Sequence, residues 1–497
     1  MARRWCGYGG METTMRLTKI ASIKPFEGAP QINCASIFGA SPKKPIIFRI
    51  PVSGERPVTY SATLPEGLQL DGNIITGSIA EEGDYSVTLI AENSLGRAEK
   101  QVTLEIKEGN LLVTPLLGFT SWNAFGSEVT QQDMIDIANK MVESGIAEYG
   151  YSYVNLDSGW QHEYGGEFDA IMPNFKFPDM KEMTDRIHSL GFKCGIYSTP
   201  MLNAWGCPKE FASIPGCTVG APDHRFTSRN GGIGVVHKEE NNAKQWEAWG
   251  FDYLKYDWNP ADPINAELMR EALVARDRDF GFCVTVMPLY EYYEYWSRYC
   301  NSFRANVDSL GFWDNFMKIY PTYLKYYHFV NKGHFFDMDM LDTGTCRPEF
   351  VKSELSEDEQ IVIYSARAFF NSPIQISSTL EDLNDFELSL YCNDEIIAIN
   401  PDEAFFAATP IFMNEKDGSM VHIYEKLLKD GSYAYAIFNL NQKGEHVRMT
   451  FEGESLLRDV WAKEDMGVYG EILMPIPAHT VKIIKSQKKR RGIECIY

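Results

Sequence analysis

Apolar runs of strand length alternate with stretches of helical spacing along the middle of this chain, between about residues 112 and 402. Eight of the runs predict strands, and several of them are followed by a predicted helix. Eight units of this size favour a (β/α)8 TIM barrel, because a strand followed by a helix is the repeating unit of that fold. A doubly wound sheet is the alternative, but no glycine-rich phosphate loop opens any of the predicted helices. The predicted strands are 116–123, 153–157, 192–197, 251–257, 282–287, 302–308, 334–341 and 373–377, and the predicted helices are 131–138, 180–190, 239–249, 265–278 and 357–370.

Short alternating runs flank this region on both sides and predict β-structure. Residues 31–108 predict an all-β unit, with runs at 46–50, 58–62, 85–90 and 100–106; the motifs given below make it resemble an immunoglobulin-like β-sandwich. Residues 403–486 predict a C-terminal antiparallel β-sandwich, with runs at 404–406, 421–424, 433–438 and 481–484. Residues 1–30 predict a poorly ordered leader, and residues 487–497 a basic, frayed tail. The chain is therefore expected to be multidomain, with the barrel in the centre.

Three short motifs make the N-terminal segment resemble small immunoglobulin-like modules. For this segment we favour a role as a spacer or packing unit over sugar binding. The motifs are Leu64-Pro65-Glu66-Gly67-Leu68, Ile75-Thr76-Gly77 and Gly83-Asp84-Tyr85.

Charge and cysteine usage narrow the possible partners. The net charge of −21 would repel phosphate backbones, which argues against a nucleic-acid partner. The ten cysteines form no CxxC pair and no cluster with histidine, so we expect no metal site. A bridge between Cys207 and Cys217 is left open. No apolar run is long enough to span a membrane, and no signal peptide is visible; the compartment (cytoplasmic, or periplasmic or secreted with a different natural N-terminus) and the oligomeric state are left open.

Charged side chains gather at the ends of the predicted strands, where TIM barrels carry their working groups. Lys255 and Asp257 project on the same side of one strand, and Arg304 and Asp308 on the same side of another. A structural ion pair or a helix cap would explain any one of these ends. Two carboxylates that face each other across a barrel mouth, however, are the groups that glycoside hydrolysis needs. We therefore expect Asp257 to be the nucleophile, with a pKa lowered by Lys255, and Asp308 to be the acid and base.

A series of motifs over residues 112–485 resembles glycoside hydrolase family 27, the α-galactosidases and α-N-acetylgalactosaminidases. The resemblance implies a retaining mechanism with Asp257 and Asp308 in the roles given above, and no cofactor. It also implies that Trp122 stacks on the sugar, that Asp157, Tyr197, Lys255 and Arg304 bind its hydroxyls or orient the carboxylates, and that Asp337 and Asp339 support them by hydrogen bonds. For Trp122 and Tyr197, an aromatic ring packed at a strand end is the alternative interpretation. The motifs are Gly118-Phe119-Thr120-Ser121-Trp122-Asn123-Ala124-Phe125, Tyr153-Val154-Asn155-Leu156-Asp157-Ser158-Gly159-Trp160, Phe177-Pro178-Asp179-Met180, Gly195-Ile196-Tyr197, Tyr253-Leu254-Lys255-Tyr256-Asp257, the run from Tyr299 through Arg304 to Asp308, the run from Gly333 through Asp337 and Asp339 to Leu341, and Asn393-Asp394-Glu395-Ile396-Ile397-Ala398-Ile399-Asn400.

The chain departs from this family's pattern at three places. Ser158 stands where the family has a second Asp that grips hydroxyls of galactose, which leaves the exact sugar open. Trp258 follows the predicted nucleophile in place of a family Cys, so the disulfide that many relatives carry beside the site is expected to be missing. The fifth strand lacks the acidic and Trp residues of many relatives, and Met287 and Tyr290 are candidates to line the site instead.

We therefore predict a retaining exo-glycosidase of the α-galactosidase type, acting on an oligosaccharide or glycoconjugate. α-N-Acetylgalactosaminidase and β-L-arabinopyranosidase activities are the alternatives within the class. A carbohydrate-binding protein without activity is the alternative from a different class.

Overall fold

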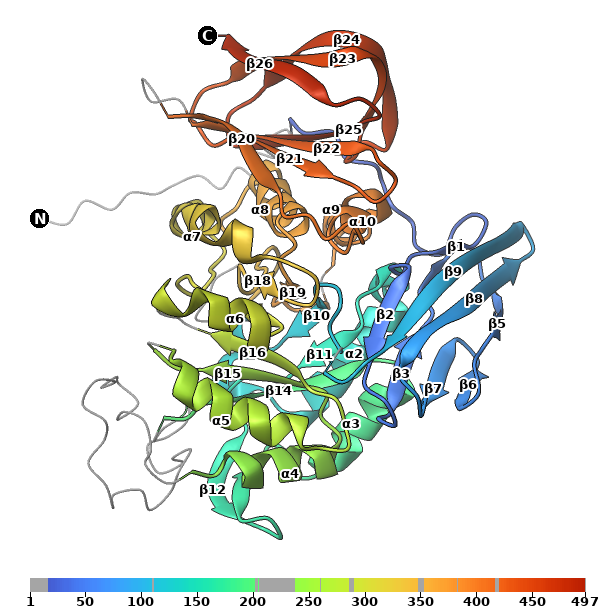
Figure 1. Cartoon of the computed structure of the whole chain (residues 1–497), viewed down its shortest axis with the longest axis vertical. Helices are drawn as coiled ribbons and strands as arrows, with labels where there is room; N and C mark the ends of the chain where they lie inside the picture. The colour runs from blue at the N-terminus through green and yellow to red at the C-terminus, as the bar shows by residue number, and fades with distance from the viewer. Residues whose placement is uncertain are drawn as a thin grey trace, which may run out of the picture.

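The computed structural model describes residues 17–109, 111–201, 204, 237–259, 261–285, 290–346, 353–381, 383–415 and 420–496. A central region of parallel strands and helices lies between an N-terminal β-unit and a C-terminal antiparallel sheet (Figure 1). Within the described ranges, no helix combines the length and the apolar character that crossing a membrane requires.

The central region is built on an eight-stranded parallel sheet of the half-barrel, TIM-like kind, in the order β18-β17-β16-β15-β14-β11-β10-β19. Each predicted strand of this region corresponds to one observed strand, although the observed strands are shorter. An isolated parallel bridge also joins Leu341, beyond β18, to Ile376 of β19. The strands are β10 (Leu117–Thr120), β11 (Tyr153–Asn155), β14 (Lys193–Ser198), β15 (Tyr253–Asp257), β16 (Gly281–Thr285), β17 (Ser302–Phe303), β18 (Phe335–Phe336) and β19 (Ile374–Ile376).

Several strand predictions run past the observed strand ends, two of them at predicted site residues. Trp122 belongs to the short helix α1 instead of the predicted strand 116–123, and Asp308 lies five residues beyond the end of β17. Side chains replace the sheet as backbone partners there: the backbone N–H of Ser309 donates to the Asp339 carboxylate at 2.7 Å, and the N–H of Asp339 donates to Asp337 at 2.7 Å. The polar residues after these strands therefore form loops that are held by carboxylates.

The helices of the central region begin at residues whose side chains accept hydrogen bonds from the first turn. Capping boxes pair Thr130 with Asp133 at α2, and Ser356 with Glu359 at α8. The five predicted helices are all observed with similar bounds, whereas α6, α7 and α9 were not predicted. α6 and α9 have only seven residues each, and α7 contains Pro321, a residue that usually interrupts a helix. The helices are α1 (Trp122–Phe125), α2 (Gln131–Glu143), α3 (Met180–Ser189), α4 (Glu239–Trp249), α5 (Pro263–Val274), α6 (Tyr293–Tyr299), α7 (Trp313–Tyr326), α8 (Glu357–Phe369), α9 (Asp385–Tyr391) and α10 (Asp394–Ile399).

The N-terminal unit contains a four-stranded sheet, β2-β9-β8-β5, and a three-stranded sheet, β3-β7-β6, with the small pair β1-β4. Its core is made of alternating apolar positions such as Val87 and Leu89. The unit is fastened to the central region by Glu148, whose carboxylate accepts from Arg49 at 2.7 Å and from the backbone of Val52 at 2.9 Å. Its strands are β1 (Gln31–Ile32), β2 (Ile37–Ala40), β3 (Ile46–Arg49), β4 (Val52–Ser53), β5 (Thr59–Thr63), β6 (Leu68–Asp71), β7 (Ile74–Gly77), β8 (Gly83–Asn93) and β9 (Gly96–Ile106).

The prediction of a poorly ordered leader is wrong for residues 17–30. Ile20 and Ile23 are buried in the core of the central region. The N–H of Thr18 donates to Asp358 at 2.7 Å, and the N–H of Ala21 donates to the carbonyl of Trp461 at 2.8 Å. The apolar residues of this segment pack against the central region, which its composition did not suggest. Residues 1–16 lie outside the described residues.

The C-terminal unit is a seven-stranded antiparallel sheet, β20-β21-β22-β25-β23-β24, with β26 paired to β23. Two predictions about it are wrong. Residues 404–406 form a turn, because the carboxylate and carbonyl of Asp402 accept from Ala404 and Phe405. The tail expected to fray forms β26 from residue 490 onward. The strands are β20 (Thr409–Asn414), β21 (Val421–Leu427), β22 (Tyr433–Asn439), β23 (Glu445–Asp459), β24 (Glu464–Ile476), β25 (Thr480–Ser486) and β26 (Arg490–Ile496).

Candidate active site

The predicted site residues lie at or just beyond the carboxyl ends of alternate strands of the parallel sheet. Asp257 is the last residue of β15, Asp157 follows β11 by two residues, and Arg304 directly follows β17. Because parallel strands end at the same edge of a sheet, this arrangement gathers their charges in one place. Lys255 reaches across to Asp157, with Nζ 2.7 Å from Oδ2. The direct ion-pair partner of Lys255 is therefore Asp157, whereas the sequence suggested Asp257.

Charged neighbours together affect the pKa of Lys255 more than burial does. Burial acts to lower the pKa of Lys255, but the carboxylates of Asp157 and Asp339 outweigh it and hold that pKa above its usual range. Lys255 is therefore a permanent cation and hydrogen-bond donor at this edge of the sheet.

Asp257 is only 7% exposed, and its Oδ1 atom has no hydrogen-bond partner among the described residues. Burial raises the pKa of the Asp257 carboxyl, although Arg304, Lys255 and Thr285 act in the opposite direction. The prediction of a lowered pKa is thus wrong, because it counted the cation of Lys255 and not the loss of water. The Asp308 carboxylate also contributes to raising the pKa of Asp257, so the two carboxylates interact.

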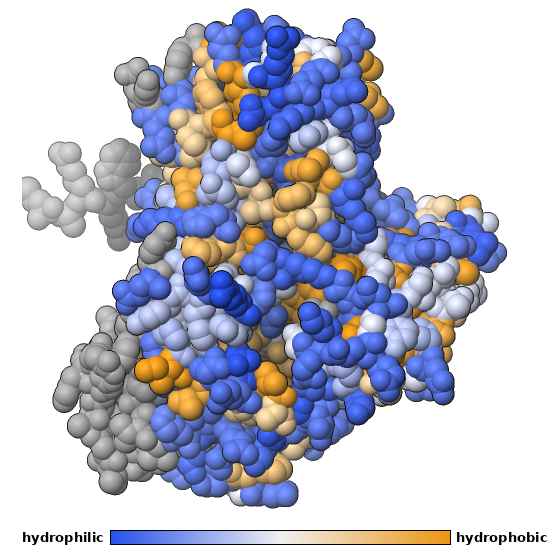
Figure 2. Space-filling view, viewed as in Figure 1, coloured by the Kyte–Doolittle hydropathy of each residue, from blue (hydrophilic) through white to orange (hydrophobic). Residues whose placement is uncertain are grey.

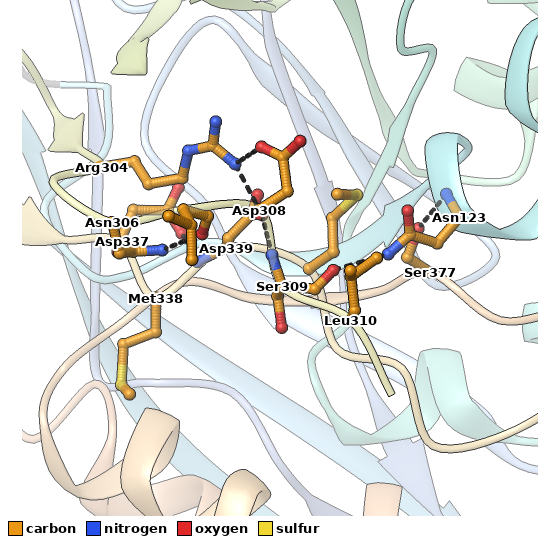
Figure 3. A network of polar contacts seen from close by, with 12 residues as sticks. Asn123, Arg304, Asn306, Asp308, Ser309, Leu310, Asp337, Met338, Asp339 and Ser377 are labelled. Carbon is orange, nitrogen blue, oxygen red and sulfur yellow. Dashed lines mark hydrogen bonds and ion pairs between the residues drawn. The ribbon is translucent and has the colours of Figure 1, made fainter. Parts of the chain in front are cut away.

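Arg304 links the second predicted carboxylate to the interior of the molecule (Figure 3). Its Nη1 lies 2.8 Å from Oδ1 of Asp308 and 2.6 Å from Oδ2 of Asp339. The Arg304 side chain is 1% exposed, whereas the Asp308 side chain is 63% exposed. Burial acts to lower the pKa of Arg304, but Asp339, Asp308 and Asp257 outweigh it and keep the guanidinium charged. A buried cation thus sits among three carboxylates, of which only Asp308 extends far into solvent.

Asp337 and Asp339 support this cation from behind, as the sequence predicts. The Asp339 carboxylate accepts hydrogen bonds from Arg304 and from the backbone N–H of Ser309. The backbone of Asp339 itself is left-handed, with a φ of 69°. Burial raises the pKa of Asp337 to about 6, and the neighbouring Asp339 adds to the effect. Burial also acts to raise the pKa of Asp339, but Arg304 and Lys255 outweigh it and lower that pKa. Asp339 is therefore the ionised partner that balances Arg304.

The two aromatic residues predicted at the site, Trp122 and Tyr197, differ in how exposed they are. Trp122 opens α1 and is half-buried, while Tyr197 lies in β14 and is 1% exposed. The Tyr197 ring is 5.9 Å from Nζ of Lys255, and its carbonyl accepts from Nε1 of Trp160 at 3.0 Å. Tyr197 is thus adjacent to the charged groups and is also part of the packed sheet.

The loop that carries Asp308 is held by residues that the sequence analysis missed. Asn315 donates to the Asp308 carbonyl and accepts from the N–H of Leu310, both at 2.9 Å. Arg367 of α8 donates to Oγ of Ser309 at 3.0 Å and to the carbonyl of Met340 at 2.6 Å. A charged residue within the apolar run of α8 was the available signal for Arg367; Asn315 has no sequence signal of its own.

Asn123 supports the same loop from the other side. Its Nδ2 donates to the carbonyl of Ser309 at 2.9 Å and to Asp342 at 2.6 Å, while its backbone N–H donates to Ser377 (Figure 3). Burial raises the pKa of Asp342 to about 8, although the hydrogen bond from Asn123 opposes the shift. The loop that carries Asp308 is therefore held by four separate parts of the chain, through Asn123, Asn315, Asp339 and Arg367.

Several departures from the expected pattern are visible at the site. Ser158 is buried, and its N–H donates to Oδ1 of Asp157 at 2.7 Å. The seven cysteines in the described part of the chain are free. Cys207, Cys217 and Met287 lie outside the described residues, as does the side chain of Tyr290. Within the described ranges, no group of three or more His, Cys, Asp or Glu side chains could hold a metal ion.

Comparisons with known proteins agree with this geometry. The family model for alpha galactosidase A matches residues 114–215 and 222–402, and a model for Ig domains matches residues 29–107. A Bacteroides fragilis protein of solved structure is 29% identical, with a TM-score of 0.80, over 93% of this chain and 98% of that one. The alpha-galactosidase A of Cellvibrio japonicus is 26% identical over 76% of this chain and 92% of its own length. The alpha-galactosidase of Cyamopsis tetragonoloba is 26% identical over 81% of this chain and 90% of its own length.

Proposed function

Since this chain belongs to the alpha galactosidase A family, glycoside hydrolase family 27, we propose that it hydrolyses terminal α-linked galactose with retention of configuration. The observation that carries the proposal is the position of Arg304, which is bonded to Asp308 and interacts electrostatically with Asp257. One buried cation thus interacts with two carboxylates, one at the end of β15 and one in the loop beyond β17. A pair of carboxylates is the equipment that glycoside hydrolysis needs.

In this mechanism Asp257 attacks the anomeric carbon and forms a covalent glycosyl-enzyme. Asp308 first protonates the departing oxygen and then removes a proton from the water that hydrolyses the intermediate. The nucleophile must be ionised, and the cations of Arg304 and Lys255 favour that form against the effect of burial. Asp308 gives up its proton in the first step and recovers one from the attacking water in the second, and its side chain, 63% exposed, is accessible to that water. A retaining enzyme needs the two carboxyl groups about 5–5.5 Å apart, and we expect this separation for Asp257 and Asp308.

The remaining predicted residues bind the sugar in this proposal. Asp157 and Lys255 form a donor and acceptor pair that suits two adjacent hydroxyls, since their 2.7 Å contact holds both groups in place. Trp122 supplies an aromatic face against which the apolar face of a galactose ring stacks, and Tyr197 binds a sugar hydroxyl or orients the carboxylates. Ser158, in place of an Asp, offers one hydroxyl instead of a carboxylate, so we expect weaker selection at one sugar hydroxyl than a second carboxylate would give.

We propose that the central strands close into a (β/α)8 barrel and that the flanking units are β-sandwiches. The parallel bridge between Leu341 and Ile376 supports closure, because it joins the two outer strands of the sheet order. The proposed units span residues 31–108, 112–402 and 403–486.

A panel of 4-nitrophenyl glycosides tests the proposed activity. We expect release of nitrophenol from the α-galactoside, with α-galactose as the first-formed product when the reaction is followed by proton NMR. Faster turnover of the N-acetyl-α-galactosaminide or the β-L-arabinopyranoside would move the assignment to one of those activities. Binding of galactose without turnover of any member of the panel would favour a carbohydrate-binding protein.

A further inference from the structure

A large cavity lies at the opposite end of the central sheet from the candidate active site. It has a volume of about 930 Å³ and is enclosed by the N-terminal unit, the starts of the central strands, α10 and the C-terminal sheet. In Figure 2 the surface is hollowed between the N-terminal unit and the rest of the molecule, and apolar side chains lie in the hollow. Cavities of this size hold ligands of drug size in other proteins. Its inner lining includes Phe38, Leu112, Tyr153 and Lys193.

Lys193 brings a buried charge to this cavity. It is the first residue of β14 and is only 7% exposed. Its Nζ lies 4.9 Å from the ring centre of Phe38 and 5.7 Å from that of Tyr153. Within the described residues, its ammonium group makes no hydrogen bond and no ion pair. Lysine is almost never this deeply buried without a partner, because its ammonium loses its hydration. Burial lowers the pKa of Lys193 to about 8, against the opposing effect of two carboxylates.

Those two carboxylates, Asp252 and Asp279, are engaged elsewhere. Asp252 accepts from His188 at 2.8 Å and from Arg278 at 2.6 Å. Asp279 accepts from the backbone of Ser41 at 2.7 Å and lies 3.5 Å from Lys44. Neither of them therefore completes the hydrogen bonding of Lys193.

Other cations that line the cavity are compensated. Arg49 is paired with Glu148 at 2.7 Å, Arg458 with Glu395 at 2.5 Å and Lys485 with Asp430 at 3.7 Å. Lys193 thus differs from these three cations in having no described carboxylate within ion-pair distance of its ammonium group, which lies near the rings of Phe38 and Tyr153.

We propose that this cavity binds an organic carboxylate, whose anionic group accepts hydrogen bonds from Lys193 and whose apolar body packs against Phe38, Leu112 and Tyr153. An ammonium group has three donors, and a carboxylate is the strongest acceptor for them in a site shielded from water. The ligand contacts both the N-terminal unit and the central sheet, so its binding stabilises the junction between them. The site is separate from the proposed glycosidase site, since Lys193 and Tyr197 stand at opposite ends of one strand.

Calorimetric titration of the full chain with matched carboxylates and alcohols tests this site. The probes are phenylacetate against 2-phenylethanol, cinnamate against cinnamyl alcohol, and glucuronate against glucose. We expect at least one carboxylate to bind about tenfold or more tightly than its alcohol, as a charge-assisted hydrogen bond requires. The preference is expected to vanish in Lys193→Met, which keeps the length and apolar body of the side chain. It is expected to persist in the control Lys485→Met, which removes a compensated lysine from the same cavity.

Two further measurements locate the ligand. Saturating galactose should leave the carboxylate affinity unchanged, and anomalous scattering from 4-bromophenylacetate in crystals should place the bromine beside Phe38. The proposal is overturned if no carboxylate is preferred over its alcohol. It is also overturned if the preference survives in a folded Lys193→Met variant, or if galactose competes with the probe. In those cases Lys193 serves only to pack the N-terminal unit against the sheet.

Discussion

The two ends of the central sheet are built from the same strands and have opposite chemistry. On β15, Tyr253, Lys255 and Asp257 alternate along one side of the strand, with the ring at the start and the charges towards the end. Tyr153 and Asp157 repeat this order at and just beyond β11. At the starting end, Tyr153 and Tyr253 pack with leucines 111, 112 and 116 and with the thiol of Cys283. At the finishing end, cations and carboxylates pair with one another.

The difference shows how one parallel sheet can place apolar packing at one end and charged, reactive groups at the other. Charges tolerate burial at the finishing end because each cation meets a carboxylate, as Arg304 meets Asp339. The starting end is covered by the N-terminal unit, and tyrosines occupy the first positions of β11 and β15, but on β14 the order is reversed. There Lys193 stands at the start and Tyr197 near the end. This reversal is the feature that separates the proposed carboxylate site from the rest of the starting end.

Asp257→Asn should have the largest effect on activity. Loss of the nucleophile is expected to lower kcat by at least about 10⁴-fold, because the covalent route is closed while the shape of the side chain is kept. The measurement is turnover of 4-nitrophenyl α-galactoside, with circular dichroism to show that the fold is intact. Asp279→Asn is the matched control, because it changes a buried aspartate at the starting end; activity should persist there even if the melting temperature falls. Equal loss in both variants would contradict the separation of the two ends.

Asp308→Ala should reduce activity by an amount that depends on the leaving group. Hydrolysis of raffinose is expected to fall by about 10²–10⁴-fold, because the departing sugar needs a proton. Hydrolysis of the 4-nitrophenyl glycoside should fall much less in its first, bond-breaking step, since nitrophenolate leaves without one. A burst of nitrophenol followed by slow turnover would be the kinetic sign. Identical losses for both substrates would remove Asp308 from the acid role.

Lys255→Met should change the pH dependence as well as the rate. Burial raises the pKa of Asp257, and the charge of Lys255 opposes that shift. Removing the cation therefore raises the pKa of the nucleophile further, so the acid limb of kcat/KM should move to higher pH. Lys255→Arg keeps the charge and should move this limb less. An acid limb that stays in place in Lys255→Met would show that Asp257 does not control it.

Asp342→Asn should have the smallest effect, and on stability alone. Burial raises the pKa of Asp342 to about 8, so the folded protein favours the neutral carboxyl. The stability that this preference contributes is complete below the unfolded pKa and is lost as the pH rises through about 8. Asparagine stays neutral and still accepts from Asn123, so the variant should melt at a higher temperature than the parent at pH 9. A parent that gains stability between pH 6 and pH 9 relative to the variant would contradict this sign.

Most of the fold follows from patterns that the sequence carries locally. The bounds of α4, Glu239–Trp249, were predicted to the residue, and each central strand was found near its predicted position. The leader and β26 were missed because their order depends on partners far along the chain, such as the contact of Thr18 with Asp358. A local sequence pattern does not predict a contact with a residue so far along the chain.

The sequence predicted which residues make up the candidate site, but not which of them contact one another. The motifs identified Asp257, Lys255, Arg304 and Asp308, but two of their relations came out differently. Lys255 pairs with Asp157, and burial outweighs charge in the pKa of Asp257. Both results depend on distance and on lost water, which the order of residues along the chain does not specify. The catalytic roles themselves stay predictions until the variants above are measured.

The docked position of residues 17–23 sets the order in which this protein can assemble. Thr18, Ala21 and Ile23 bond to Asp358, Trp461 and Ser389, which all emerge from the ribosome hundreds of residues later. Residues 17–23 therefore cannot take up this position until the C-terminal sheet has been synthesised. Until then Ile20 and Ile23 lack the core in which they are buried in the folded protein.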